Sequence, residues 1–127
     1  STGIAAVDVR DIVEAAALSL TGSGLEGKTY NLVGPHLLSG PGAAGTWSKV
    51  LGKPIRYTGE NFEEYELQMR AHMPVWSAFD LRSMFQAFSE RGFASTGEDV
   101  RQFAELLGHE PRSYEDFAAE AAQAWQA

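Results

Sequence analysis

The sequence predicts an α/β fold, in which a small mixed or parallel sheet of about three short strands precedes a cluster of helices. Apolar or β-branched runs at residues 4–9, 28–33 and 54–58 are typical of strands. Helical patterns separate these runs, and a β-α-β-α-β order is typical of a sheet covered by helices. Residues 60–127 contain helical patterns only. The 127 residues are therefore predicted to form a single domain, with an α/β half at residues 1–59 and a helical lobe at residues 60–127.

The two helices of the first half are predicted from their caps and their apolar faces. Asp8 is expected to cap the first helix, and Asp11 to close a pair that resembles a capping box. Apolar side chains then recur on one helical face until Gly22 ends the helix. For the second helix, Ser39 is the expected cap and Gly52 the expected end.

Four helices are predicted in the second half. The first and the last are expected to begin at Asn61 and Ser113, where an acidic residue three positions later gives the spacing of an N-terminal cap. Pro74 opens the second helix, and the third follows the loop at residues 92–97 and ends at Gly108.

The second of these four helices carries the densest group of large apolar side chains in the chain. A group of this kind usually belongs to a core. These side chains occupy too many faces of one helix for a single core contact, however, so part of the group is expected to line a pocket or an interface. Its members are Trp76, Phe79, Met84, Phe85 and Phe88.

Composition and charge exclude several classes of protein. The net charge of −7 disfavours binding to nucleic acid or to an anionic membrane surface. The absence of cysteine excludes disulfide scaffolds and cysteine nucleophiles. No apolar run approaches the roughly 18 residues of a membrane span, and no signal-peptide pattern is present. A cytoplasmic protein is the expectation.

A glycine-rich run, G-P-G-A-A-G at residues 40–45, matches the dinucleotide-binding pattern G-x-G-x-x-G. In a true fingerprint the first glycine lies in the turn directly after a strand. Here the preceding strand is predicted to end near Val33, and Pro41 removes a backbone N–H beside the site of the pyrophosphate. We therefore interpret the run as a glycine-rich helix start and assign it no cofactor.

The common catalytic and metal-binding motifs are absent. The sequence contains no G-x-S-x-G, no H-E-x-x-H and no tyrosine followed four residues later by lysine. His36, His72 and His109 are far apart in the sequence and have no second ligand at metal spacing. We predict no metal site and name no catalytic residue; His36 or His72 is a candidate to line a pocket.

Four stretches together resemble the NmrA-like, atypical short-chain dehydrogenase/reductase family. They are V-D-V-R-D-I-V-E-A-A-A at residues 7–17, G-K-T-Y-N-L-V-G-P at 27–35, S-K-V-L-G-K-P-I-R-Y at 48–57 and L-L-G-H-E-P-R-S-Y-E-D-F at 106–117. The dipeptide Leu38-Ser39 fits between the second and third stretches. The resemblance covers nearly the whole chain in the family's order.

The resemblance implies that the chain corresponds to a C-terminal lobe, which closes over the nicotinamide and shapes the substrate site. In this family the cofactor motif lies in an N-terminal Rossmann domain, so it has no matching positions here. NAD(P) is implied for full-length relatives, and no cofactor-binding residue is predicted in this chain. The fold would then be an incomplete Rossmann-type protein, with the Gly34–Pro35 turn at the border of the cleft.

A partial fold of this kind has consequences for association. The strand near Val7 and the face of the helix that carries Ile12 would pack against upstream strands. An isolated chain should expose an apolar patch or bury it in a homodimer. The expected partner is an upstream Rossmann domain or a second copy of the chain.

Three functions are compatible with the sequence. The first is the substrate-side lobe of an NAD(P)-dependent oxidoreductase of the quinone or azo-compound reductase type, inactive alone. The second is a non-enzymatic redox-sensing or protein-interaction module, and the third is a free-standing binder of small molecules. The residues predicted to line a substrate pocket are Gly34, Pro35, His36, Trp76, Phe79 and Phe88.

Overall fold

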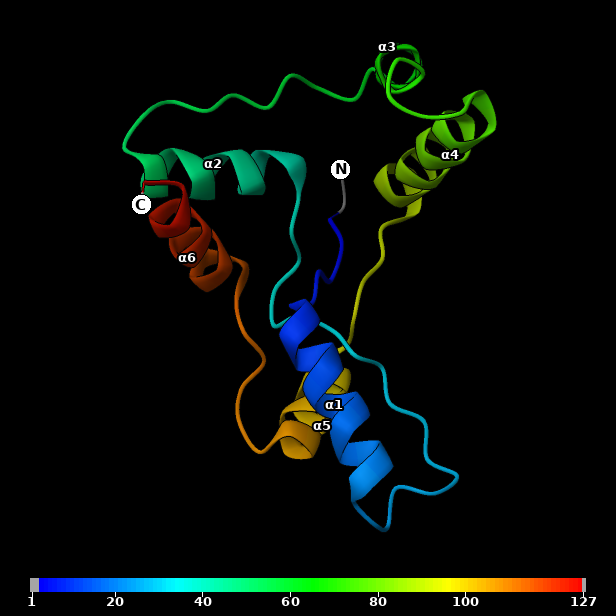
Figure 1. Ribbon diagram of the computed structural model, residues 1–127, viewed down its shortest axis with the longest axis vertical. Coiled ribbons are helices and arrows are strands. Elements are labelled where there is room, and N and C mark those ends of the chain that lie inside the picture. Colours follow the sequence, from blue (N-terminus) through cyan, green and yellow to red (C-terminus); the bar gives the residue numbers. More distant parts are fainter. Residues whose placement is uncertain (1–2, 127) are drawn as a thin grey trace.

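The computed structural model describes residues 3–126, and this part of the chain is all-helical (Figure 1). The helices lie where the helical patterns predict them, so these predictions are confirmed. They are α1 (Val9–Thr21), α2 (Gly40–Leu51), α3 (Phe62–Met69), α4 (Val75–Arg91), α5 (Gly97–Leu107) and α6 (Tyr114–Gln126).

The predicted α/β fold is wrong, because none of the three expected strands forms within residues 3–126. Two isolated β-bridges take the place of a sheet. Ile4 pairs with Leu38 in an antiparallel bridge and with Phe93 in a parallel one. A strand is stable only when its backbone groups bond to a neighbouring strand. The segment at 28–33 has β-forming side chains, but in the described chain its amides after Lys28 make no backbone hydrogen bond.

Side-chain caps explain where most helices begin. The Ser39 hydroxyl accepts the N–H of Gly42 at 3.2 Å, and the Asn61 side chain accepts the N–H of Glu64 at 3.1 Å. Thr96 and Asp99 form a reciprocal capping box at α5 that the sequence analysis did not identify.

The expected cap at α1 is only half correct. Asp8 accepts the N–H of Arg10 at 2.8 Å and is the N-cap. Asp11 does not close a capping box with it. Its carboxylate is fully buried and accepts the backbone N–H of Arg112 at 2.7 Å. The Asp11 carboxylate, which local spacing assigned to the cap, is therefore hydrogen-bonded to Arg112, 101 residues away.

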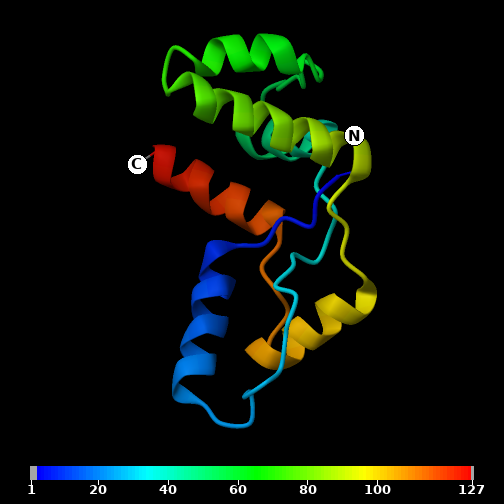
Figure 2. The same cartoon turned by 90° about the vertical axis from the view of Figure 1, so that its right-hand side faces the viewer.

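The helices pack in three pairs: α3 with α4, α2 with α6, and α1 with α5. Both views place the α1–α5 pair and the α3–α4 pair at opposite ends of the molecule (Figures 1 and 2). Extended segments connect the pairs, and an ion pair between Arg10 of α1 and Glu120 of α6 links two of them. Two pairs join a helix from residues 1–59 to one from residues 60–127, and the division into two halves stays a prediction.

The core of the described chain is small and consists mostly of alanine. Phe103 of α5 is its only large apolar side chain that is fully buried, and it packs with Ala15 and Leu107. The buried apolar residues are Ala5, Ala15, Val33, Ala78, Phe103, Leu107, Ala118 and Ala122.

Candidate functional site

A hollow lined by aromatic side chains lies between the start of α2, the segment at residues 57–62 and the last turns of α4. We call it the aromatic hollow; its rings are those of Tyr57, Phe62, Tyr65, Phe85 and Phe88. Its volume is about 430 Å³, within the roughly 300–1,000 Å³ of small-molecule sites. Its composition and size make it the best candidate for a ligand site in the described chain.

Helix packing positions the rings of the aromatic hollow. Tyr65 of α3 meets Phe85 of α4 edge to face, with centroids 5.5 Å apart and planes at 86°. This geometry is favourable for two aromatic rings and fixes α3 against α4. Phe88, one turn further along α4, lies 5.7 Å from the ring of Phe93. The site is therefore built from the contacts that hold this end of the molecule together.

A glycine at the start of α2 makes room for Tyr57. A side chain at Gly40 would overlap with the Tyr57 ring, so the ring lies directly against the helix backbone. Burial, with the nearby Glu60 carboxylate as a second cause, raises the pKa of Tyr57 above its usual value of 10.0. Tyr57 is thus a neutral hydroxyl at physiological pH.

Among the residues that the structure describes, Glu60 supplies the single acidic side chain of the aromatic hollow. The Ser89 hydroxyl donates a hydrogen bond to its carboxylate. This bond is the largest cause of a lowered Glu60 pKa, and desolvation opposes it. No lysine, arginine or histidine of the described chain lines the hollow. The described lining of the hollow is therefore mostly aromatic, with Glu60 as its charged group.

The residues predicted to line a pocket lie in three different places. Phe88 lines the aromatic hollow. Pro35 and His36 line a separate, small hollow of about 80 Å³, to which Tyr114 of α6 also contributes. Trp76 and Phe79 lie near the start of α4 and are 69% and 49% exposed.

Gly34 precedes Pro35 and is buried. A side chain at this position would overlap with the backbone carbonyl of Ala6. The turn therefore needs glycine because two backbone segments touch there.

The sequence analysis missed Tyr57, Glu60 and Tyr65. These residues come from a segment that was interpreted as a strand followed by a helix start. Tyr65 is the residue from which the site could have been inferred, because its aromatic ring can pack against the aromatic side chains of the following helix.

The glycine-rich run at residues 40–45 does not fit a dinucleotide. The Ser39 hydroxyl takes the N–H of Gly42, and Pro41 has no N–H to offer. Tyr57 covers the backbone at Gly40. The donors that a pyrophosphate would need are thus occupied, missing or covered, and we derive no cofactor chemistry from this run.

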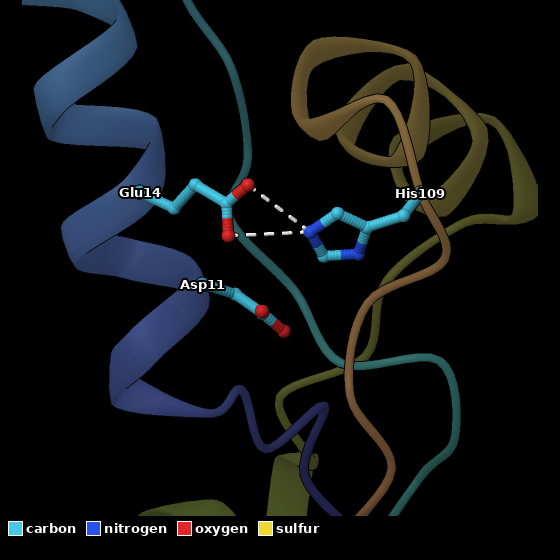
Figure 3. A group of neighbouring side chains, drawn as sticks. All are labelled: Asp11, Glu14 and His109. Carbon is cyan, nitrogen blue, oxygen red and sulfur yellow. Dashed lines mark hydrogen bonds and ion pairs between the residues drawn. The ribbon is translucent and has the colours of Figure 1, made fainter.

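A second polar group joins α1 to the loop between α5 and α6. Figure 3 shows Glu14 and Asp11 on α1, with Glu14 directed at the ring of His109, 3.2 Å away. The side-chain ligand atoms of Asp11, Glu14 and His109 lie within 4.8 Å of one another, a spacing that could hold a metal ion. The guanidinium of Arg112 already pairs with Asp11 and lies 3.6 Å from Glu14. We therefore interpret the group as a set of structural contacts that hold α1 to the loop between α5 and α6.

Comparison with known proteins relates the chain to oxidoreductases. It is 31% identical over 124 residues to the (4-alkanoyl-5-oxo-2,5-dihydrofuran-3-yl)methyl phosphate reductase of Streptomyces griseus, covering 96% of the chain and 42% of that protein. It is 29% identical over 109 residues to the NAD(P)H azoreductase of Xenophilus azovorans, covering 79% of the chain and 38% of that protein. Prestalk A differentiation protein A of Dictyostelium discoideum is 30% identical over 115 residues, which are 90% of the chain and 37% of that protein.

The chain spans about two fifths of the length of these relatives. No family model and no solved structure matches it. Among the helices of residues 3–126, none has the length and apolar character required to cross a membrane.

Proposed function

We propose that this chain is the substrate-side lobe of an NmrA-like, NAD(P)-dependent oxidoreductase of the atypical short-chain dehydrogenase/reductase type, acting on quinones or azo compounds. The observation that carries the proposal is an aromatic hollow of ligand size in a chain whose relatives include reductases. The nucleotide-binding half would come from residues outside this chain. Alone, the chain is inactive, because hydride chemistry belongs to the cofactor.

The lining of the aromatic hollow favours an uncharged aromatic substrate. The Streptomyces relative is named for a phosphate ester, for which the described lining residues offer no cation. A planar ring can instead lie against Tyr65, Phe85 and Phe88. The name of the azoreductase agrees better with such a site.

Binding of menadione, an uncharged quinone, tests this proposal. In amide NMR spectra of the 127-residue chain, menadione should shift signals of residues 57–65 and 85–89. Phe88→Ala should weaken binding about fivefold, because an aromatic contact contributes about 1 kcal/mol beyond the area it buries and about 1.4 kcal/mol corresponds to tenfold. Phe79→Ala is the control, since Phe79 lies on the same helix outside the hollow. Shifts confined to residues 34–38, or NADPH oxidation by this chain alone, would contradict the proposal.

A regulatory module is the second candidate, supported by the similarity to a differentiation protein. In a gene product that carries both halves, rapid NADPH oxidation with menadione supports the enzyme. Binding of NADPH without oxidation supports the regulator.

A further inference from the structure

Three polar side chains form one cluster in the lining of the aromatic hollow, and we call them the polar end: Tyr57, Glu60 and Ser89. The Ser89 hydroxyl donates a hydrogen bond to the Glu60 carboxylate. Burial is the main cause of the raised Tyr57 pKa, and the charge of Glu60 and a hydrogen bond between the two side chains raise it further. Glu60 is therefore the acceptor at the centre of the polar end.

Glu60 can accept a further hydrogen bond from a ligand. The bond from Ser89, opposed by desolvation, holds the Glu60 pKa below its usual value, so the side chain is ionised at neutral pH and only accepts hydrogen bonds. A carboxylate offers about four acceptor positions, so it can bond to Ser89, Tyr57 and a ligand together. Glu60 is exposed, and a donor on a ligand in the hollow can therefore reach it.

The rings of the aromatic hollow bring a bound ring close to the polar end. Tyr57 and Phe85 are 42% and 41% exposed, so both keep ring surface that a ligand can cover. Phe88 directly precedes Ser89 in α4. A ligand ring that packs on Phe88 thus lies next to the hydroxyl that bonds to Glu60, and its substituents come near the carboxylate.

We propose that Glu60 makes the aromatic hollow selective for aromatic compounds that carry a neutral hydroxyl or amino group, and that it disfavours aromatic carboxylates and sulfonates. A hydrogen bond from a ligand hydroxyl or amino group to a carboxylate is charge-assisted and stronger than one between neutral groups. An anionic substituent would instead lie beside a like charge, and no cation of the described lining offsets that repulsion. Glu60 is then a specificity-determining residue.

This inference rests on the proposed function, because it takes the aromatic hollow as the substrate site. Among azo compounds, it predicts that those with amino or phenolic hydroxyl groups bind more tightly than those with acidic groups. It concerns binding by this chain and needs no turnover for its test.

Three matched naphthalenes test the proposal by amide NMR titration of the 127-residue chain at neutral pH. 2-Naphthol should bind about fivefold more tightly than 2-methoxynaphthalene, in which a methyl group removes the donor; this ratio corresponds to about 1 kcal/mol, the usual net value of one hydrogen bond. 2-Naphthoate should bind more weakly than both. Equal affinities for 2-naphthol and 2-methoxynaphthalene would overturn the proposal.

Glu60→Gln separates the charge of Glu60 from its other contacts, because the amide oxygen can still accept the bond from Ser89. The variant should bind 2-naphthoate more tightly than the parent chain does and leave the affinity for 2-methoxynaphthalene unchanged. Glu63→Gln is the matched control, since it changes the net charge equally and Glu63 is exposed outside the described lining. An equal gain in 2-naphthoate affinity in both variants would assign the selectivity to net charge and refute the role of Glu60.

The same titrations distinguish failure of this inference from failure of the proposed function. If menadione and 2-methoxynaphthalene shift signals of residues 57–65 and 85–89 but 2-naphthol has no advantage, the hollow remains the substrate site and the selectivity is wrong. If neither menadione nor any of the naphthalenes shifts these signals, the hollow is not the substrate site and both proposals fail.

Discussion

At Gly40, the ring of Tyr57 occupies the space that a side chain would fill. Alanine normally stabilises a helix relative to glycine, but here it would push the ring away and disrupt the aromatic hollow. We expect Gly40→Ala to lower the free energy of unfolding by about 1–3 kcal/mol, the usual cost of overpacking.

Gly45 in the same helix is the matched control. No atom lies within 4 Å of a β-carbon built there. Gly45→Ala should therefore raise the free energy of unfolding by about 0.5–1 kcal/mol. Urea unfolding measures both variants, and equal effects of the same sign would show that Tyr57 does not lie against Gly40.

His109 makes stability dependent on pH. Its ring is hydrogen-bonded to the backbone carbonyl of Glu110 at 2.8 Å and to Glu14 at 3.2 Å. The bond to Glu110, with that to Glu14 second, raises the pKa of His109 above its ordinary value of 6.5. A raised pKa in the folded state stabilises the protein below the unfolded pKa, and this contribution is lost as the pH rises through the folded pKa.

The test compares the urea midpoint of the parent chain with that of His109→Gln across the pH range. The parent should be more stable below pH 6.5, and the difference should disappear in alkaline solution. His72→Gln serves as the control variant. A difference that is constant with pH would mean that His109 contributes through packing alone.

Neither Glu14 nor Asp11 could be matched to its partner from the sequence. Glu14 and His109 are separated by 95 residues, and Asp11 and Arg112 by 101. Local spacing predicted the caps at Ser39 and Asn61 correctly because each capping side chain and the backbone N–H that it accepts are neighbours in the chain. Contacts between distant residues depend on how the helices pair, which periodicity does not determine.

At the scale of elements, the helices could be predicted because each satisfies its own backbone hydrogen bonds. A strand cannot satisfy its own backbone hydrogen bonds and needs a neighbouring strand. The segment at 28–33 has the side chains of a strand, but the described chain offers it no neighbouring strand. Residues 54–58 also lack a neighbouring strand in the described chain. The Ile55 N–H donates instead to the Ser48 hydroxyl, at 2.8 Å. Both segments contain β-forming side chains, but local β-propensity alone did not predict correctly whether a sheet forms.

Amide hydrogen exchange tests the state of this extended segment. Amides of residues 29–32 should exchange at nearly the rate of an unfolded chain, because no backbone acceptor protects them in the described structure. Amides of α5 near Phe103, which is fully buried, should exchange far more slowly and provide the internal reference. Strong protection of residues 29–32 would reveal a strand partner and contradict the arrangement described here.

At the scale of the whole molecule, three helix pairs without a shared core should not unfold as one unit. Cooperative unfolding requires that the loss of one part destabilises the others. Close packing of helix on helix is confined to each pair, and the ion pair between Arg10 of α1 and Glu120 of α6 is exposed. The α2–α6 pair carries its own probe, since Trp47 stacks on Trp125 with centroids 5.0 Å apart and donates to the Tyr114 hydroxyl. Trp76 on α4 is largely exposed and should contribute little change.

We therefore expect tryptophan fluorescence and far-ultraviolet circular dichroism to give different urea midpoints. Fluorescence follows the α2–α6 pair, whereas circular dichroism averages all helices. Trp76→Phe should leave the fluorescence midpoint unchanged. Coincident midpoints, with equal calorimetric and van 't Hoff enthalpies, would show that the extended segments couple the pairs as strongly as a common core would.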